Sequence, residues 1–400
     1  MGFVSAPRRI SVLGATGSVG AATLDLIDRA SPGQYEVVAL TARTNARELA
    51  RLAIQHKAEF VAIADPACEP ELRQALLGQP IEIASGEGGV IEAAQRRADW
   101  IMAAIVGAAG LRPTLAALRQ GTALAFANKE CLVCAGGLFM QEAARCGTRL
   151  LPVDSEHNAV FQVFNGAHRA NIDAITLTAS GGPFRSWDEV RMQSAVRADA
   201  LAHPTWDMGA KISIDSATMM NKGLEVIEAC WLFDLPEDQV RVVVHPQSIV
   251  HGMVHYGDGS VLAQMGSPDM RTPIAHALAW PERMTAPVER LDLIQAGRLD
   301  FEPPDLERFP ALRLAREAVQ AGGIAPTVLN AANEIAVAAF LDDRIGFLDI
   351  AASVAEALDR AAGDEDMPSQ LGAFDDVFAI DKRARELARD LMGVPAAQNG

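Results

Sequence analysis

The sequence has few cysteines and no long apolar run. Its five cysteines in 400 residues are scattered and odd in number, which is not the pattern of a secreted disulfide framework. The longest apolar run, residues 101–111, is too short to cross a bilayer. The first strand is expected near Arg9, which leaves no room for a transit peptide. We therefore expect a chain that works in the reducing cytoplasm.

Basic residues are also in short supply. There are 35 lysines and arginines against 51 acidic residues, a net charge of −16. A field of that sign repels nucleic acids and anionic membranes, so we expect neither as a partner. A small phosphorylated ligand stays compatible with this charge, because a few local donors outweigh a distant, screened field.

The apolar runs divide the chain into regions. Up to residue 153, short runs alternate with helical periods, which predicts βαβ units on a parallel sheet; the runs are 10–13, 37–40, 60–63, 100–106, 123–127 and 150–153. Expected strands at 172–178, 240–244, 249–256 and 260–265, with a helix near 219–231, indicate an α+β region. We expect an α/β domain over 1–153, an α+β domain over 154–284, a connector over 285–310 and a small helical domain over 311–400.

A glycine motif follows the first expected strand. Gly14, Gly17 and Gly20 form a G-x-x-G-x-x-G pattern that leads into a helix beginning near Ser18. Glycines permit the tight turn and the close approach of a pyrophosphate to the free N–H groups of a helix N-terminus. The motif predicts a Rossmann-type dinucleotide-binding domain, with a purely structural turn as the alternative.

The end of the second expected strand indicates which dinucleotide binds. An acidic residue at that place selects NAD, but the chain has only Arg43 between Leu40 and Asn45. Since a guanidinium can hold the 2′-phosphate, NADP is the expected cofactor. The alternative is that Arg43 is a solvated loop charge.

Two acids follow the strand that ends near Val153. If the segment is extended, Asp154 and Glu156 share one face and aim two carboxylates at one point. A hard divalent cation resolves their repulsion through oxygen ligands, and a cysteine or histidine set for zinc is missing there. The alternative is that Asp154 caps a helix.

A third acid is expected from the helical segment that contains Glu225 and Glu228. Asn221 lies one turn before Glu225, and together with Ser216 and Lys222 it stands among apolar neighbours. This mixture predicts a pocket wall that binds phosphate. The alternative is that Glu225 simply pairs with Lys222.

Two other groups are expected to be structural. Cys131 and Cys134 form a C-x-x-C in an expected helix without a thioredoxin-like context, so neither redox chemistry nor zinc is expected. His245, His251 and His255 fall in an expected hairpin, where residues four apart lie about 13 Å from each other, too far to chelate one ion.

The motifs together resemble one family. Over nearly its whole length the chain is similar to the 1-deoxy-D-xylulose 5-phosphate reductoisomerases, at residues 14–18, 127–130, 153–158, 179–184, 203–209, 211–225, 265–270 and 329–334. The resemblance implies a homodimer with a catalytic middle domain, and a mobile loop at 180–209 without a continuous apolar face. It also implies NADPH, a divalent cation (Mg²⁺, Mn²⁺ or Co²⁺) and a small sugar phosphate that is rearranged and reduced to 2-C-methyl-D-erythritol 4-phosphate in the non-mevalonate isoprenoid pathway.

The resemblance also assigns the site residues. It implies metal ligands at Asp154, Glu156 and Glu225, and catalytic roles for these three with Lys129 and His203. Contacts to the substrate are implied for Lys129, Ser155, Glu156, Ser180, His203, Trp206, Ser216, Asn221, Lys222 and Glu225. Contacts to NADPH are implied for Thr16, Gly17, Ser18, Val19, Asn45, Asn128, Glu130 and Gly209, with Arg43 displaced by one position from the family's usual basic residue.

Two other functions share parts of the pattern. A semialdehyde-dehydrogenase-like NADP oxidoreductase has a similar glycine motif but needs a nucleophilic cysteine, which no cysteine here matches in context. A non-catalytic NADP-sensing protein needs only the first domain, and the polar residues around Asp154 and Glu225 would then have no purpose.

Overall fold

The computed structural model describes residues 6–206, 208–365 and 367–394, which form two compact units. Unit 1 contains the chain up to residue 128 together with residues 141–158 and 269–289. Unit 2 contains residues 129–140, 159–268 and those from 290 onward. Helix α6 (Glu130–Cys146) contributes residues to both units, and the expected domain boundaries at 153, 284 and 310 stay predictions.

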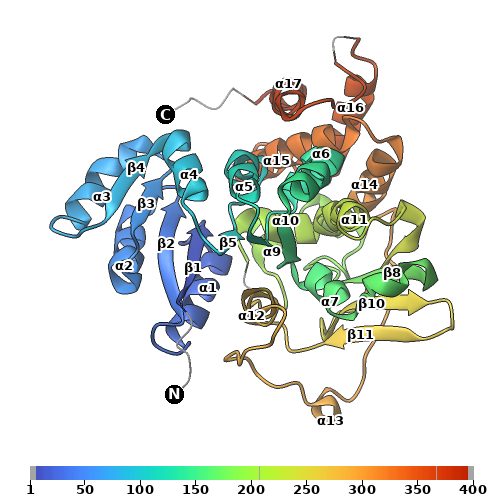
Figure 1. The fold of residues 1–400 in the computed structure, drawn as a ribbon. Helices are drawn as coiled ribbons and strands as arrows, with labels where there is room; N and C mark the ends of the chain where they lie inside the picture. Colours follow the sequence, from blue (N-terminus) through green and yellow to red (C-terminus); the bar gives the residue numbers. More distant parts are fainter. Residues whose placement is uncertain (1–5, 207, 366, 395–400) are drawn as a thin grey trace. The chain divides into compact units, whose positions relative to one another are not determined.

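Unit 1 is built on a seven-stranded sheet whose strand pairs are all parallel (Figure 1). The strands, in the order β4-β3-β2-β1-β5-β6-β7, are β1 (Arg8–Leu13), β2 (Tyr35–Ala42), β3 (Phe60–Ile63), β4 (Glu82–Ser85), β5 (Trp100–Ala103), β6 (Ala123–Phe126) and β7 (Arg149–Pro152). The order reverses between β1 and β5, and the carboxyl ends of strands at such a switch point are where ligands bind. The predicted Rossmann-type architecture is confirmed.

The helices of unit 1 alternate with its strands. They are α1 (Ser18–Asp28), α2 (Ala46–His56), η1 (Pro66–Cys68), α3 (Glu69–Ala75), α4 (Gly86–Gln95), η2 (Ala108–Gly110), α5 (Leu111–Leu118) and α12 (Arg271–Ala279). Trp100 in β5 is fully buried, and its indole N–H donates to the carbonyl of Ala277 at 3.0 Å. That bond holds α12, which comes late in the chain, against the sheet of the first domain.

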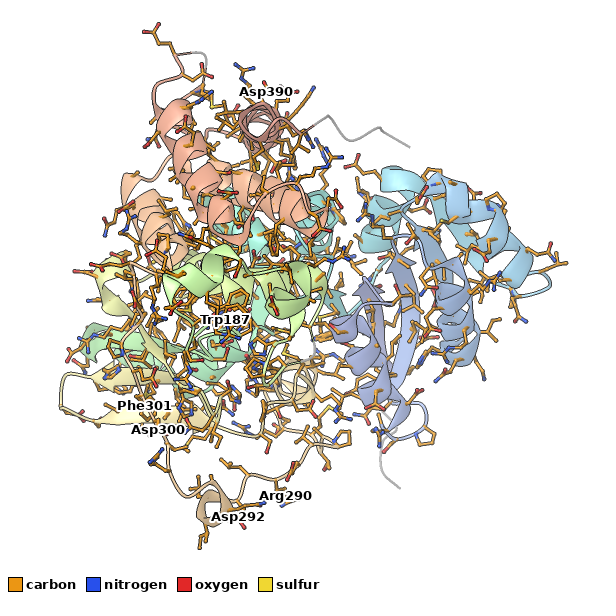
Figure 2. The ribbon with its side chains drawn as sticks, turned by 180° about the vertical axis from the view of Figure 1, so that it is seen from behind. Trp187, Arg290, Asp292, Asp300, Phe301 and Asp390 are labelled. Carbon is orange, nitrogen blue, oxygen red and sulfur yellow. The ribbon has the colours of Figure 1, made fainter. Side chains whose placement is uncertain are left out.

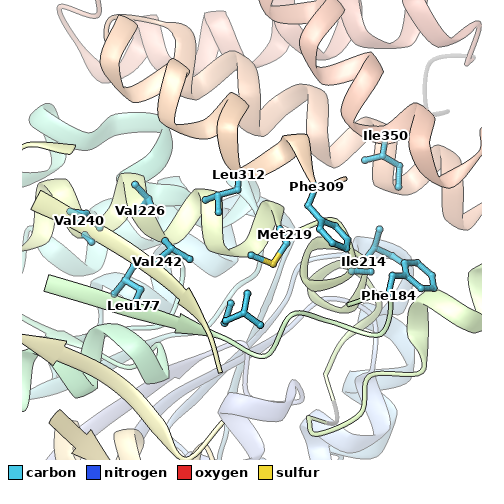
Figure 3. Packing of buried hydrophobic residues seen from close by; sticks show 14 of the residues in the cluster. Leu177, Phe184, Ile214, Met219, Val226, Val240, Val242, Phe309, Leu312 and Ile350 are labelled. Atoms are coloured by element: carbon cyan, nitrogen blue, oxygen red, sulfur yellow. The ribbon is translucent and has the colours of Figure 1, made fainter. Parts of the chain in front are cut away.

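Unit 2 contains a mixed four-stranded sheet in the order β11-β10-β8-β9. Its strands are β8 (Ile172–Ala179), β9 (Val240–Val244), β10 (Val250–Tyr256) and β11 (Val261–Met265); only β8 and β9 pair in parallel. Side chains of β8 and β9 pack against helices in one buried cluster, which Figure 3 shows with Leu177, Val240, Val242, Val226 and Leu312. The predicted α+β character is confirmed.

The other helices of unit 2 lie before β8, between β8 and β9, and after β11 in the chain. They are η3 (Gly166–Asn171), α8 (Glu189–Gln193), α9 (Arg197–Leu201), α10 (Ala210–Ala217), α11 (Met220–Leu232), η4 (Glu237–Gln239), α13 (Leu293–Ala296), α14 (Pro310–Ala321), α15 (Ala325–Leu341), α16 (Phe347–Ala362) and α17 (Phe374–Met392), while α7 (Ser155–Val163) begins in unit 1. Most residues of α15 are buried, as expected of a helix with neighbours on several sides. No described helix is both long and apolar enough to cross a membrane.

The segment expected as a loop without an apolar face is partly helical and anchored. It contains α8 and α9, and its Phe184, Met192 and Ala200 are fully buried in the same hydrophobic cluster as β8 and β9. The rings of Phe184 and Trp187 lie 4.5 Å apart, with Trp187 labelled in Figure 2. Single buried side chains therefore anchor this segment. The expected mobility of this segment stays a prediction.

Candidate functional site

The tight glycine turn between β1 and α1 leads into a helix N-terminus that has no side-chain cap. Gly14 has φ +93°, and a Cβ there would lie 2.8 Å from the carbonyl oxygen of Ala104. Gly17 is the N-cap of α1, which has no side-chain capping bond and no acid in its first turn. Because the first N–H groups of a helix lack intrahelical acceptors, this terminus suits a pyrophosphate. The observed turn agrees with the predicted dinucleotide motif.

Two other residues implied for NADPH are engaged in holding the backbone. Asn45 is the N-cap of α2, and its side-chain oxygen accepts the N–H of Glu48 at 3.2 Å. The buried amide of Asn128 donates to the carbonyls of Ile105 and Gly107, which fixes the loop after β5. Arg43 is exposed just beyond β2. The contacts of these three residues with NADPH stay predictions.

The acids after β7 do not lie on an extended segment, so the expected shared face of Asp154 and Glu156 was wrong. Helix α7 begins at Ser155, and the carbonyl of Asp154 accepts the N–H of Asn158 at 2.8 Å. The helix starts immediately after the strand and turns Glu156 into its first turn. The Oδ1 atom of Asp154 lies 3.6 Å from Nδ1 of the buried His157. The hydroxyl of Ser155 donates to Glu156 at 2.6 Å.

In unit 2, Glu225 stands between two lysines. Its Oε1 atom lies 2.9 Å from Nζ of Lys129, and its Oε2 atom accepts from Lys222. Asn221 donates to the same Oε1 at 2.5 Å and accepts from Lys129 at 2.9 Å. Glu225 is 1% exposed, so these interactions take place away from bulk water. The alternative expectation of a Glu225–Lys222 pair is confirmed, and Lys129 and Lys222 bring two positive charges to this cluster, which suits an anionic ligand.

The expected phosphate residues come from two helices instead of one. Ser216 lies near the end of α10, whereas Asn221 and Lys222 lie in the first turn of α11. Met219 separates the helices with φ +65°, and the hydroxyl of Thr218 accepts the N–H of Met220 at 3.3 Å. A left-handed methionine leaves no clear signature in the sequence, because this conformation is rare outside glycine and asparagine.

Ser180 and His203 form a hydrogen-bonded pair, and the backbone donors around His203 show which of its ring nitrogens carries the proton. Nδ1 of His203 accepts the N–H groups of Thr205 at 3.2 Å and Trp206 at 2.9 Å, so the proton of the neutral ring is on Nε2. Nε2 lies 2.9 Å from Oγ of Ser180 and donates to it, and the N–H of Gly182 also donates to that oxygen at 3.2 Å. Burial lowers the pKa of His203, which favours this neutral form. The hydroxyl hydrogen of Ser180 therefore points away from both His203 and Gly182.

His251 belongs to the same surroundings, although its spacing gave no signal for this. Its ring lies 6.2 Å from that of Trp206. Burial, with the charge of Lys222 and the neighbouring His245, lowers its pKa to about 4. His245 instead bonds the carbonyl of Asp300 at 2.7 Å and stacks on Phe301, both labelled in Figure 2. The expectation that the three histidines do not chelate one ion stays a prediction.

The two cysteines of the C-x-x-C are buried. Cys131 and Cys134 lie in α6 outside any disulfide, and the hydroxyl of Thr327 donates to the Cys134 carbonyl at 2.9 Å. Burial raises the pKa of Cys134 well above its usual value, which suppresses the reactive thiolate.

Unit 1 has a parallel sheet with a glycine turn at its switch point, and unit 2 contains buried lysines and hydroxyl groups. These features together are typical of two-part NAD(P)-binding enzymes. Models of one family match most of the chain. Residues 10–136 match 1-deoxy-D-xylulose 5-phosphate reductoisomerase, residues 150–233 match its C-terminal domain, and residues 265–387 match the DXP reductoisomerase C-terminal domain.

Individual relatives agree. The reductoisomerase of Rhodospirillum centenum is 58% identical over 386 residues, which are 96% of this chain and 94% of that protein. The Zymomonas mobilis enzyme, solved in complex with NADPH, is 54% identical with a TM-score of 0.89 over 96% of this chain and 99% of its own. A DOX-P reductoisomerase solved with NADPH, fosmidomycin and magnesium is 44% identical, with a TM-score of 0.91 over 96% and 98%. The chain belongs to the 1-deoxy-D-xylulose 5-phosphate reductoisomerase family and, as a member, is an NADPH-dependent oxidoreductase.

Proposed function

We propose that this chain converts 1-deoxy-D-xylulose 5-phosphate to 2-C-methyl-D-erythritol 4-phosphate, using NADPH and a divalent cation, with the residues described above. The observation that carries the proposal is the buried Lys129–Glu225–Lys222 cluster with Asn221, in a chain that also has the glycine turn and is 58% identical to a reductoisomerase. The reaction belongs to the non-mevalonate isoprenoid pathway and takes place in the cytoplasm.

The glycine turn fits NADPH. Gly14 and Gly17 form the tight turn before α1, whose N-terminus has no side-chain cap, and Thr16, Ser18 and Val19 flank the position of a pyrophosphate. Arg43 binds the 2′-phosphate, and further contacts come from Asn45, Asn128, Glu130 and Gly209. When bound, NADPH supplies the hydride that reduces the rearranged aldehyde, and the cation supplies Lewis-acid stabilisation of the developing oxyanion.

The donors proposed for the cation are all carboxylate oxygens, from Asp154, Glu156 and Glu225. Such a set fits Mg²⁺, Mn²⁺ or Co²⁺ better than zinc, which prefers nitrogen and sulfur. Both oxygens of Glu225 already accept from lysines, so a cation competes with Lys129 or Lys222 for them. A lysine displaced in this way is free to donate to the oxygens of the substrate, which gives Lys129 its proposed role beside Ser155.

The phosphate is held by Ser180, Ser216, Asn221 and Lys222. Ser180 accepts from His203 and from Gly182, so its own hydrogen is available for a phosphate oxygen. Lys222 adds a nearly buried positive charge. Binding of the phosphate orients the reacting carbons at the other end of the substrate. Closure of His203 and Trp206 over the substrate excludes water.

We also propose that the chain is a homodimer, on the strength of its family resemblance. Sedimentation velocity at micromolar concentration should give twice the mass of the 42.5 kDa chain. A monomer at that concentration would contradict this part of the proposal.

The activity is tested by following NADPH oxidation with 1-deoxy-D-xylulose 5-phosphate as substrate. Oxidation should require the sugar phosphate, cease with EDTA and return with Mn²⁺. Oxidation that is indifferent to EDTA would favour the semialdehyde-dehydrogenase-like alternative. Tight NADPH binding without any turnover would favour an NADP-sensing protein.

A further inference from the structure

Unit 2 contains a second buried ionic cluster, centred on Lys211. The ammonium of Lys211 lies 2.7 Å from Glu130 Oε1 and 2.8 Å from Asp215 Oδ2. The exposed fractions of the side chains are 19% for Lys211, 5% for Glu130 and 1% for Asp215. Burial opposes the charge of the lysine, but the carboxylates of Asp215, Glu130 and Glu334 raise the pKa of Lys211. Lys211 is therefore charged at neutral pH.

The C-terminal helices extend this cluster. Nδ2 of Asn333, on α15, donates to the second carboxylate oxygen of Asp215 at 2.8 Å. Asn333 is fully buried, and its Oδ1 atom has no hydrogen-bond partner among the residues that the structure describes. The bond to Asp215 thus defines the orientation of this amide. As a result, Asp215 is held from both sides, by Lys211 and by Asn333.

The partners of Lys211 are immediate sequence neighbours of proposed site residues. Glu130 follows Lys129 and is itself implied in NADPH binding, while Asp215 precedes Ser216 of the phosphate group. Lys211 itself comes two residues after Gly209, where the segment 180–209 ends. One ammonium group therefore connects the start of α6, the helix that carries Ser216 and the end of that segment.

We propose that Lys211 is a positioning residue that orients the Glu130 carboxylate toward NADPH and fixes α10 so that Ser216 meets the phosphate. The inference rests on the proposed function. The ammonium of Lys211 is engaged by two carboxylates, so it acts through them and not by touching the substrate. A compact ammonium that is bonded to two carboxylates fixes the orientation of both. Neutral packing or a single ion pair would not do so.

The direct test replaces Lys211 by Met and uses Arg385→Met as a matched control. Arg385 also has a side chain that is 19% exposed and lies 2.7 Å from each of two carboxylates, Glu334 and Asp381, neither of which is a proposed site residue. Both variants should lose melting temperature, because each leaves two buried or partly buried carboxylates without their cation. Only Lys211→Met should weaken NADPH binding, measured by fluorescence titration, and raise the KM for the sugar phosphate, each roughly tenfold with a smaller change in kcat.

A second variant separates positioning from charge. Lys211→Arg keeps the cation, so it should restore the melting temperature, but its planar guanidinium cannot reproduce the geometry of the ammonium. NADPH affinity should therefore stay reduced by about threefold or more. This variant also decides the question if Lys211→Met does not fold.

Two outcomes would overturn the inference. One is wild-type affinity for NADPH and substrate in a folded Lys211→Met or in Lys211→Arg. The other is an equal loss of affinity in Arg385→Met, which would reveal a general effect of stability. Both presuppose an active wild-type enzyme; a wild type that binds NADPH but turns nothing over would contradict the proposed function instead.

Discussion

The glycine turn of unit 1 and the Glu225 cluster of unit 2 are both suited to anions, but they are built differently. The turn is made of backbone: Gly14 and Gly17 allow it to be tight, and the helix terminus provides N–H groups. The cluster is made of side chains, because Lys129 reaches Glu225 from a position 96 residues away. A site made of backbone should therefore fail when volume is added, and a site made of side chains should fail when charge is removed.

The largest expected effect comes from removing the charge of the cluster. Glu225→Gln keeps the shape but leaves two lysines without their carboxylate and takes away a proposed metal ligand. Turnover should fall about a thousandfold or more, while the Kd for NADPH changes little, since the cofactor turn is untouched. Glu228→Gln is the control, because Glu228 lies on the same helix and is equally buried at 1% exposure. Wild-type turnover of Glu225→Gln at low Mn²⁺ would contradict the assignment.

The next effect comes from adding volume to the turn. Gly14→Ala combines a left-handed φ with a Cβ that meets the Ala104 carbonyl, so it should cost about 3 kcal/mol of stability and most of the NADPH affinity. Gly33→Ala is the control, since Gly33 also has a positive φ of +78° but open space around its missing Cβ. It should cost about 1–2 kcal/mol and leave NADPH binding unchanged. Equal effects on NADPH binding would show that the turn is only structural.

The difference between the two regions also explains how far sequence reasoning reached. The first sheet and its glycine turn depend on neighbouring residues, and they were predicted apart from β4, whose sequence has no apolar run. The helix start at Ser155 and the left-handed Met219 are local events without a distinctive residue, so both were misjudged. The Lys211 cluster joins residues 81 and 118 positions apart, and no local pattern carries that information.

A smaller effect is expected from pH, through the Ser180–His203 pair. The neutral ring accepts two backbone N–H groups at Nδ1, and protonation there would turn the acceptor into a donor. Because burial lowers the pKa of His203, the unfolded state binds more protons in the window between the lowered value and 6.5. Stability should thus be constant above pH 6.5, decline between pH 6.5 and the lowered pKa, and level off below it, whereas substrate affinity should decline as the pH falls through the lowered pKa.

The KM for the sugar phosphate measured against pH checks this expectation. Ser180→Ala is the control, since it retains the titration of the substrate's own phosphate but lacks the hydroxyl that His203 orients. A KM that rises equally in both proteins would assign the pH effect to the substrate alone.

The central claim is that the proposed metal-binding carboxylates, which include Glu225, and the residues proposed to bind the substrate phosphate act as one site. Calorimetric titration with a ligand that has a phosphonate at one end and a hydroxamate at the other tests it most directly, in wild type and in Glu225→Gln, each with and without Mn²⁺. The claim predicts that Mn²⁺ raises the affinity of the wild type at least about tenfold and does not raise that of Glu225→Gln. Equal affinity with and without Mn²⁺ in the wild type would contradict it.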